Sequence, residues 1–343
     1  MTEIKVNTQK PYSVLIEENL IEKTGVLINR LCNPKKVLII TDSNISKLYH
    51  KYLRDMIKGY RIYSYIFEAG EKSKNMDTVI DICNLLNREL FSRNDLIIAL
   101  GGGITTDIAG FAASIFKRGI DYISIPTSLL AMIDSSVGGK TGVNTDYGKN
   151  LLGSFYQPKL VIIDPTLLKT LPKQNFNEGM AEVIKCALIK SNSLFEKINE
   201  YDKDNLIDII IETISIKKEI VEQDEFEKDK RILLNFGHTI GNAIEKLSNY
   251  SISHGQAVMI GIIKTLELSK IHCGLNPKVI DSVKEIANNF MLLTETYFTF
   301  DAISNQVVFD KKVDCSTVKE VLLEDIEKPV IKNLTINEYE RVL

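Results

Sequence analysis

The sequence has no excess of basic residues and no long apolar run. Its 343 residues include 42 Lys and Arg against 45 Asp and Glu, a formal net charge of -3. A general nucleic-acid-binding protein is basic overall or carries a stripe of cations, so the composition argues against a nucleic-acid partner. No stretch of 18 or more apolar residues is present, and we therefore expect no membrane-spanning helix and no membrane partner.

Cysteine is scarce, and no pair has the spacing of a metal or redox motif. The five cysteines are scattered and none forms CxxC, which is typical of reduced thiols in a cytosol. The first residues, MTEIKVNTQKPYSV, have no basic start followed by an apolar core, so they predict no export signal. We expect a cytoplasmic protein.

Short apolar runs recur in the first half of the chain, and helical stretches such as residues 76–90 separate several of them. The runs are rich in β-branched or aromatic residues and lie at 37–41, 63–67, 96–100, 122–126 and 160–164. Continuous apolar strands alternating with helices indicate a parallel sheet that is covered on both faces. The first half therefore predicts an α/β domain with a doubly wound, mainly parallel sheet.

The pattern changes after residues 168–179, where strand-like runs almost disappear. Long segments with a spacing near 3.6 follow, at 179–191, 205–223, 237–248, 254–272 and 277–290. This periodicity predicts a second, mainly α-helical domain. A chain of this length usually needs more than one core, and we place the boundary near residue 170, which gives domains of 1–170 and 171–343.

Glycines 101–103 follow the strand at 96–100 and precede a helical sequence. Glycine lets the backbone approach a ligand closely, and the free N–H groups of a helix start favour phosphate. The spacing is not GxGxxG, and such a turn can also be only a tight connection. A second stretch dense in Gly, Ser, Thr and Lys, residues 124–150, follows the next strand, so two such loops at one sheet edge predict a large phosphorylated ligand or two of them.

Lys140, Lys149 and Asn150 lie on loop-like sequence in this second stretch, and Arg118 ends the helix before it. Lysines are mostly exposed surface residues. Alternatively, these side chains form an anion-binding cluster in a cleft.

Residues 179–190 form a segment that is apolar almost all round, with Glu182 and Lys185 three residues apart. An i,i+3 pair is usually a mild surface contact. A helix that is apolar all round is normally buried, however, and a buried carboxylate needs a partner.

Two of the chain's four histidines, His238 and His254, begin consecutive predicted helices. Helical spacing puts His238, Asn242 and Glu245 on one face, while Gly237 and Gly241 leave room for a close neighbour. Two imidazoles and a carboxylate such as Glu182 make a catalytic divalent site, commonly zinc. The alternative is that both histidines are polar core residues or lie at helix caps, behind Ser251 and Ser253 as capping residues.

Several blocks of the sequence together resemble 3-dehydroquinate synthase, in that family's order and over most of residues 42 to 313. They are GEKSK (70–74), GGGITTDIAGFAASIFKRG (101–119), SIPTSLLAMIDSSVGGKTGVN (124–144), GKNLLGSFYQP (148–158), GMAEVIK (179–185), LLNFGHTIGNAIE (233–245) and SHGQAV (253–258). The resemblance implies an NAD-binding α/β domain, a helical metal- and substrate-binding domain, and an active site in the cleft between them.

The resemblance also implies roles for individual residues, by matching position. NAD would be held by Asp42, Glu71, Lys74, Gly102, Gly103, Asp107, Thr127, Ser128 and Thr170, with Lys140 and Lys149 beside it. The metal, zinc or sometimes cobalt, would be held by Glu182, His238 and His254. The substrate would meet Asp134, Lys140, Lys149, Asn150, Lys185, Lys217, Arg231, Asn235 and one of Lys311 and Lys312. Arg118 matches an arginine that reaches into the neighbouring subunit's site, so a homodimer is implied.

The implied reaction converts 3-deoxy-D-arabino-heptulosonate 7-phosphate to 3-dehydroquinate and phosphate. In this family NAD oxidises the C5 hydroxyl with help from the metal, phosphate leaves from the acidified neighbouring carbon, hydride returns to C5, and an aldol closure forms the ring. The substrate's own phosphate takes the proton. NAD is reused in each turnover, so the enzyme is a lyase of the shikimate pathway, which leads to the aromatic amino acids.

Three positions depart from the family's pattern. Asn242 stands where the family usually has a second histidine, and asparagine cannot accept a proton at neutral pH. Gln256 replaces a glutamate and would tune the orientation of His254 if the two side chains are in contact. The stretch after residues 310–312 lacks the usual glycine.

Three rival functions follow from these departures and from the shared fold. The first is a related sugar-phosphate cyclase with another substrate; Arg231, Asn235 and the lysine pair at 311–312 favour dehydroquinate synthesis over it. The second is an NAD-dependent polyol or glycerol-phosphate dehydrogenase, which would consume its NAD. The third is a non-catalytic relative that keeps NAD and metal, suggested only by Asn242.

Overall fold

The computed structural model describes residues 1–311 and 317–343. The chain divides into two compact units, Met1–Pro172 and Lys173–Leu343, called here the N-terminal and C-terminal units. Among the described residues, none of the helices is both long and apolar enough to span a membrane.

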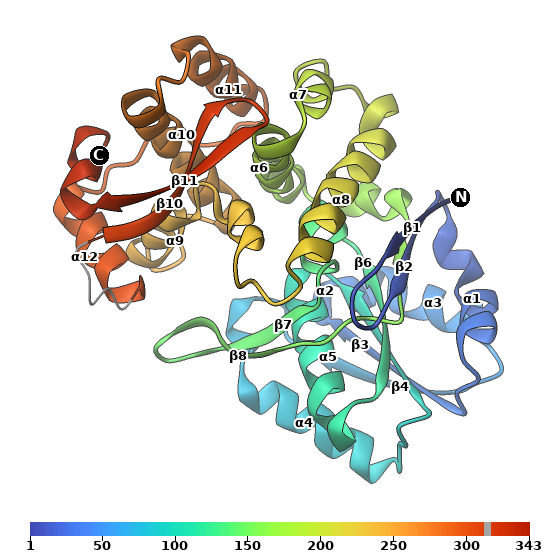
Figure 1. The fold of residues 1–343 in the computed structure, drawn as a ribbon. Helices are drawn as coiled ribbons and strands as arrows, with labels where there is room; N and C mark the ends of the chain where they lie inside the picture. Colours follow the sequence, from blue (N-terminus) through green and yellow to red (C-terminus); the bar gives the residue numbers. More distant parts are fainter. Residues whose placement is uncertain (312–316) are drawn as a thin grey trace. The chain divides into compact units, whose positions relative to one another are not determined.

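A seven-stranded sheet forms the centre of the N-terminal unit, in the order β1-β2-β9-β6-β5-β3-β4 (Figure 1). Its strands are β1 (Thr2–Val6), β2 (Tyr12–Ile16), β3 (Lys36–Asp42), β4 (Arg61–Phe67), β5 (Leu96–Gly101), β6 (Asp121–Pro126) and β9 (Leu160–Ile163). Every neighbouring pair is parallel except β1 and β2, which form an antiparallel hairpin. The prediction of a mainly parallel α/β sheet is confirmed, and β1–β2 is an antiparallel addition that the sequence analysis did not include.

Helices and short helical turns connect these strands. They are η1 (Leu20–Lys23), α1 (Thr24–Leu31), α2 (Ser43–Ile45), η2 (Ser46–His50), α3 (Lys51–Met56), η3 (Glu71–Ser73), α4 (Met76–Arg88), α5 (Gly103–Ile115), η4 (Phe116–Arg118), η5 (Ala131–Ser135) and η6 (Pro165–Thr170). Leu38 and Ile40 of β3 belong to a buried cluster with side chains of α4 and α5. Ile39, which lies between them in sequence, is not part of that cluster but is also fully buried. Successive strand residues point to opposite faces, so both faces of the sheet are covered. That explains why the strands are continuously apolar.

Residues 140–155 form a separate antiparallel hairpin of β7 (Lys140–Thr145) and β8 (Gly148–Phe155). The sequence analysis treated this stretch as a loop, which is wrong for Lys140, Lys149 and Asn150. Gly142 and Gly153 face each other across the hairpin, and a Cβ on Gly153 would lie 2.3 Å from the Thr141 carbonyl oxygen. Glycine is a poor strand former on propensity alone, and here close backbone approach requires it.

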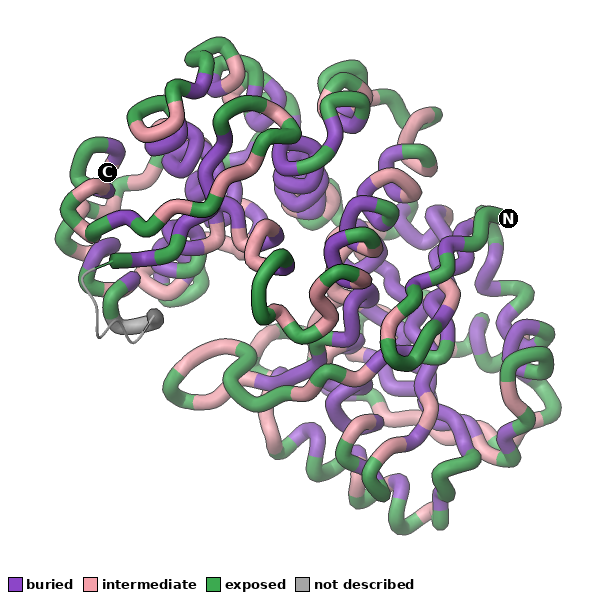
Figure 2. The backbone as a smooth tube through the Cα atoms, viewed as in Figure 1, coloured by how far each residue is buried: buried purple, intermediate pink, exposed green. Residues whose placement is uncertain are grey.

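The C-terminal unit is mainly helical. Its elements are α6 (Lys173–Lys190), α7 (Asn192–Asn199), η7 (Lys203–Asn205), α8 (Leu206–Gln223), η8 (Lys230–Asn235), α9 (His238–Leu247), α10 (His254–Cys273), α11 (Pro277–Asn289), α12 (Phe300–Lys311), β10 (Thr317–Asp325), β11 (Lys328–Thr335) and η9 (Ile336–Arg341). Helix α6 begins before the predicted 179–191. Figure 2 shows that buried residues concentrate in α6 and in the middle of α10.

The β10–β11 hairpin is a feature that the sequence analysis missed. Its strands are antiparallel, and Val321, Leu322 and Leu323 of β10 are buried. The Leu323 N–H donates to the Ser269 hydroxyl of α10 at 3.0 Å. An isolated hairpin is marginal in water, so packing against α10 stabilises a sequence whose local pattern alone does not stand out.

Candidate active site

The carboxyl ends of β3, β4, β5 and β6 bring the predicted cofactor residues of the N-terminal unit to one edge of the sheet. Asp42 is the last residue of β3, Glu71 and Lys74 follow β4, Gly102 follows β5 and Thr127 follows β6. The Thr127 N–H donates to the Gly101 carbonyl at 2.9 Å, which ties two of these loops together. Ligands of open α/β sheets bind at this edge.

Gly102 and Gly103 form the turn into α5. Gly102 is the N-cap and offers no side-chain acceptor, so the N–H groups of the first turn remain available to an anion. A Cβ on Gly103 would lie 3.2 Å from the Ser135 Oγ, and one on Gly102 3.5 Å from the Ser128 Oγ. The turn is therefore a narrow, hydroxyl-lined cradle that suits a phosphate group.

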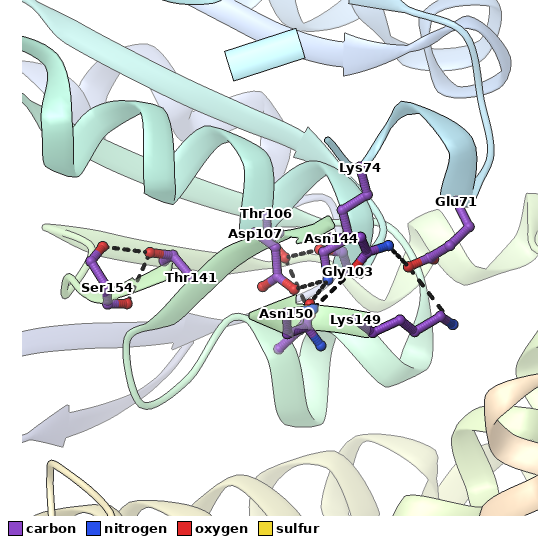
Figure 3. Close-up of polar contacts among 11 residues, drawn as sticks. Glu71, Lys74, Gly103, Thr106, Asp107, Thr141, Asn144, Lys149, Asn150 and Ser154 are labelled. Atoms are coloured by element: carbon purple, nitrogen blue, oxygen red, sulfur yellow. Dashed lines mark hydrogen bonds and ion pairs between the residues drawn. The ribbon is translucent and has the colours of Figure 1, made fainter. Parts of the chain in front are cut away.

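Lys74 is at the centre of a polar cluster beside this turn (Figure 3). Its ammonium group donates to the Asp107 carboxylate at 2.5 Å and to the Asn150 side-chain oxygen at 2.6 Å. Burial raises the pKa of Asp107, and the Lys74 ammonium opposes that shift. These two bonds link α5 to the β7–β8 hairpin. Lys74 is only 6% exposed, so the link lies inside the unit.

Asn144 completes the cluster and is a residue that the sequence analysis did not single out. Its amide donates to Glu71 at 2.7 Å, and its side-chain oxygen accepts the Asn150 N–H at 3.0 Å. Lys149 forms an ion pair with Glu71 at 3.7 Å. Figure 3 shows Asn144 between Glu71 and Asn150. The only signal in the sequence was its place in the GGKTGVN block.

The other predicted residues of this unit lie on separate elements. Asp134 lies on the π-helical turn η5, a type of turn that is frequent at functional sites. Thr170 is hydrogen-bonded to the Tyr49 hydroxyl at 2.6 Å, and Lys140 is exposed at the start of β7. Arg118 does not end α5, as the sequence predicted, but lies in the following turn with a φ of 64° and an exposed side chain.

In the C-terminal unit, glycines set the approach of the helices that carry the histidines. A Cβ on Gly261 of α10 would lie 2.0 Å from the Gly237 carbonyl oxygen, and one on Gly241 of α9 3.0 Å from the Ala257 carbonyl oxygen. A Cβ on Gly255 would lie 2.4 Å from the Glu178 carbonyl oxygen of α6. The backbones of α6, α9 and α10 therefore meet without intervening side chains.

This packing brings Glu182, His238 and His254 together, with one ligand atom of each within 4.8 Å of the others. The Nε2 atoms of His238 and His254 lie 3.5 and 3.6 Å from the same Glu182 oxygen, Oε1. Those separations exceed an ordinary hydrogen bond. Ligand atoms around a tetrahedral zinc ion with bonds of roughly 2.0 to 2.2 Å lie roughly 3.3 to 3.6 Å apart, so the arrangement fits three ligands of one cation.

The charges within the triad suit a cation as well. Burial would raise the pKa of Glu182, but Lys185 and His238 together hold it well below its usual range. Burial and the neighbouring Lys185 lower the pKa of His238 to about 4. Burial would lower the pKa of His254, but its contacts with Glu182 and Glu245 raise it to about 10. The site thus offers an ionised carboxylate and a neutral imidazole, and His254 releases a proton when it binds a metal.

Each imidazole also has an acceptor for its other nitrogen. His238 Nδ1 lies 3.2 Å from the Phe236 carbonyl oxygen, and His254 Nδ1 lies 3.1 Å from Glu245 Oε2. The sequence placed Glu245 on the face of His238 but gave it no role. Ser253 occupies the N-cap of α10 without a side-chain capping bond, so the alternative that Ser253 caps this helix with its side chain is wrong.

Several cations of the same unit are buried. The predicted site residues Lys185, Lys217 and Arg231 are 2%, 5% and 1% exposed, and Lys264 is 8% exposed. Lys185 is one turn from Glu182 on α6 and its ammonium contacts Oε2, while Arg231 donates to the Glu225 carbonyl at 2.7 Å. Removing a cation from water costs on the order of several kcal/mol, and the Glu182 carboxylate and the Glu225 carbonyl offset part of that cost for Lys185 and Arg231.

The remaining predicted residues of this unit have simple positions. Asn235 ends η8, and its amide approaches Glu227 at 3.4 Å. Lys311 is the last residue of α12, and Lys312 lies outside the described residues. Asn242 is exposed on α9, one turn after His238.

Gln256 does not contact His254 in the way that the sequence analysis considered. Its amide donates to the Met291 carbonyl at 3.2 Å, and its oxygen accepts the Leu293 N–H at 2.6 Å. Only an amide can make both bonds at once, because a carboxylate has no donor. Gln256 therefore fixes the segment after α11 against the first turn of α10.

Comparisons with known proteins match both units. The family model for the N-terminal part of 3-dehydroquinate synthase matches residues 64–178, and the model for its C-terminal part matches residues 179–313. The chain is 43% identical over 338 residues to the 3-dehydroquinate synthase of Clostridium botulinum strain Alaska E43, and the alignment covers 96% of each chain.

Two solved structures have a similar fold and are about a quarter identical in sequence to this chain. A 2-deoxy-scyllo-inosose synthase, complexed with carbaglucose-6-phosphate, NAD+ and Co2+, has a TM-score of 0.91 at 26% identity and covers 99% of each chain. The 2-epi-5-epi-valiolone synthase from Streptomyces hygroscopicus, with NAD+ and Zn2+ bound, has a TM-score of 0.86 at 26% identity and covers 100% of this chain and 97% of its own.

Proposed function

This chain belongs to the 3-dehydroquinate synthase family, and we propose that it converts 3-deoxy-D-arabino-heptulosonate 7-phosphate to 3-dehydroquinate and inorganic phosphate. It is then a phosphorus-oxygen lyase of the shikimate pathway. The family match over residues 64–313 carries the assignment, and the meeting of Glu182, His238 and His254 in one place supports it.

The cofactors are NAD and a divalent metal, zinc or cobalt. Glu182, His238 and His254 would hold the metal, since their ligand atoms have the spacing of a tetrahedral site. The glycine turn before α5 would hold the pyrophosphate of NAD, with Asp42 and Thr127 on the neighbouring strand ends. When bound, the nicotinamide would accept a hydride from the carbon that bears the substrate hydroxyl and later return it, and the metal would lower the pKa of that hydroxyl, which gives up its proton.

The cationic side chains of the chain match the charges of this substrate. The heptulosonate phosphate carries one carboxylate and one phosphate, and both are strong acceptors for Lys and Arg. Lys185, Lys217 and Arg231 supply buried cations in the C-terminal unit, and Lys140 and Lys149 supply further ones on the β7–β8 hairpin. These residues would bind and orient the substrate, and the low exposure of Lys185, Lys217 and Arg231 limits competition from water there.

Proton transfer in the elimination step follows from the side chains present. Asn242 on α9 has no titratable group, so it cannot take the proton that leaves with phosphate. The substrate's own phosphate accepts that proton, which leaves Asn242 the role of a hydrogen-bonding neighbour.

A homodimer is the proposed assembly. Arg118 is exposed in a turn that holds it in a left-handed conformation, so its side chain can reach a second subunit. On the β7–β8 hairpin, Tyr147, Leu151 and Leu152 are 81%, 61% and 44% exposed. Strand β8 pairs only with β7 among the described strands, and an apolar edge strand of this kind is usually covered by a partner.

The proposed location is the cytoplasm. Cys32, Cys83, Cys186 and Cys273 are free thiols, which suits a reducing compartment. Thiol titration of the protein in rapidly lysed cells is expected to find these four groups reduced.

The closest alternative is a cyclase for a different sugar phosphate, because both solved structures named above are cyclases of that kind. Arg231 and Asn235, which favour the heptulosonate phosphate, both lie on the short turn η8 (Lys230–Asn235). The test is to offer the purified protein the heptulosonate phosphate and glucose 6-phosphate separately, and to identify the product in each case. Dehydroquinate from the first and no phosphate release from the second is expected; the reverse result would assign the alternative.

A further inference from the structure

Glu245 contacts one of the proposed metal ligands from a position two turns into α9. Its Oε2 lies 3.1 Å from His254 Nδ1, and its side chain is 7% exposed. His238 begins the same helix. A single helix therefore carries one proposed ligand, His238, and the carboxylate that accepts a hydrogen bond from the other histidine, His254. The positions are seven residues apart, which places them on the same face.

The two histidines differ in how their rings are held. The His238 ring has the Phe236 carbonyl as acceptor, two residues earlier on the same stretch of backbone. His254 begins α10, where Ser253 gives no side-chain cap, and its side chain is 36% exposed against 18% for His238. His254 therefore depends more on a contact from another element.

Glu245 also holds the connection between α9 and α10. Its backbone carbonyl accepts the Tyr250 N–H at 3.0 Å and the Ser248 hydroxyl at 2.8 Å. Asn249 and Tyr250 in this connection have φ values of 50° and 63°, an uncommon backbone conformation for such residues. The backbone of Glu245 thus fixes the start of the connection, and its side chain fixes the ring of His254 at the end.

We infer that Glu245 is a positioning residue of the metal centre, an inference that rests on the proposed metal site. An acceptor at Nδ1 makes that nitrogen the donor of the imidazole, so the lone pair lies on Nε2, the atom that faces Glu182. The carboxylate fixes the tautomer and the ring orientation of His254 and increases its basicity as a ligand. Glu245 itself does not touch the metal or the substrate.

The test compares zinc binding by wild-type protein and by Glu245→Ala and Glu245→Gln, with Glu285→Gln as control for an exposed carboxylate on α11. Competition with a chromogenic chelator gives the zinc dissociation constant. We expect an increase of about 10- to 100-fold for alanine, a smaller one for glutamine, whose oxygen can still accept from Nδ1, and none for the control. Turnover at saturating zinc should fall less than affinity does.

Two further readouts separate positioning from loss of structure. Urea unfolding of the zinc-free proteins tests whether the alanine variant folds, and glutamine, which is nearly isosteric, provides a second variant if it does not. Nitrogen NMR shifts of the histidines should show Nδ1 protonation of His254 in zinc-bound wild type and a mixture of tautomers in the alanine variant. Wild-type zinc affinity in both folded variants would overturn this inference alone. A wild-type protein that binds no zinc would overturn the proposed metal site and this inference with it.

Discussion

Glu182 is the residue on which the proposed metal chemistry depends most. It is 1% exposed and lies between two imidazoles and the Lys185 ammonium. Its position on α6 could be predicted because a carboxylate in an all-apolar helix needs a partner. Its convergence with His238 and His254 was one of two alternatives from residue chemistry, because no local spacing links residues so far apart in sequence, and the resemblance to a family favoured it.

The Glu182→Gln substitution tests this residue in two ways. We expect zinc affinity to fall by at least about 100-fold, since a direct ligand is lost. We also expect the zinc-free protein to lose roughly 3 kcal/mol of unfolding free energy, because the buried Lys185 keeps its charge without the carboxylate. Chelator competition and urea unfolding measure the two effects. Unchanged zinc affinity in a folded variant would remove Glu182 from the site.

Asp224 gives a pH dependence that does not involve the metal. Its carboxylate accepts the N–H groups of Lys228 at 2.9 Å, Asp229 at 2.7 Å and Arg231 at 3.0 Å. Burial would raise the pKa of Asp224, but these bonds lower it below the ordinary 3.8. A folded pKa below the unfolded one stabilises the protein above the unfolded pKa, and the contribution disappears as pH falls through the folded value.

We therefore expect Asp224→Asn to be less stable than wild type by about 1 kcal/mol at neutral pH, a modest effect because the group is only partly buried. The difference should shrink as the pH falls below the ordinary carboxyl pKa of 3.8. Urea unfolding at several pH values measures it. A difference that stays constant over this range would mean that the charge of Asp224 has no part in the turn.

At the scale of elements, the contact of α9 with α10 is the feature that builds the metal centre. Gly237, Gly241 and Gly261 lie where the two helices meet. This contact could be predicted in part, since two of these glycines lie within three residues of His238. The partner Gly261 carries no such signal, because a glycine within a long helical pattern is ordinarily only unfavourable by propensity.

Gly261→Ala should disturb this contact directly. The new Cβ would lie 2.0 Å from the Gly237 carbonyl oxygen, so the helices must move apart. We expect a loss of about 1–3 kcal/mol in stability together with weaker zinc binding, because His238 is next to Gly237. Lys270→Ala, at an exposed position of the same helix, is the control. If thermal unfolding and zinc affinity match the control, the close approach is not required.

The same scale shows where pattern analysis succeeds and where it does not. Strands β3, β5 and β6 are continuously apolar because the sheet is covered on both sides, and this makes them easy to predict. The β7–β8 hairpin contains glycines and polar residues that pair across its two strands. Two of its residues, Asn144 and Asn150, also form hydrogen bonds with Lys74. Its strands exist because of those contacts, which no local pattern encodes.

At the scale of the whole molecule, the proposed dimer and the role of Arg118 can be tested by mixing subunits. Arg118→Ala and Glu182→Gln homodimers should each be inactive. In a mixed dimer, the subunit with intact Glu182 receives Arg118 from its partner, so random exchange should restore about a quarter of wild-type activity. Mixing Glu182→Gln with His254→Ala should restore nothing, because both defects lie in the same kind of site. Equal activity in the two mixtures would contradict a shared site.

The central claim is that this chain is a metal-dependent synthase that reuses its NAD, and turnover of the heptulosonate phosphate tests it most directly. Protein stripped with a chelator, given catalytic NAD, should release no phosphate until zinc is added. Release should then exceed the amount of NAD many times over, with dehydroquinate as product and no lasting rise in NADH absorbance. A rise in NADH in proportion to product would identify a dehydrogenase instead, and a zinc-loaded protein that binds NAD but releases no phosphate would identify a non-catalytic relative.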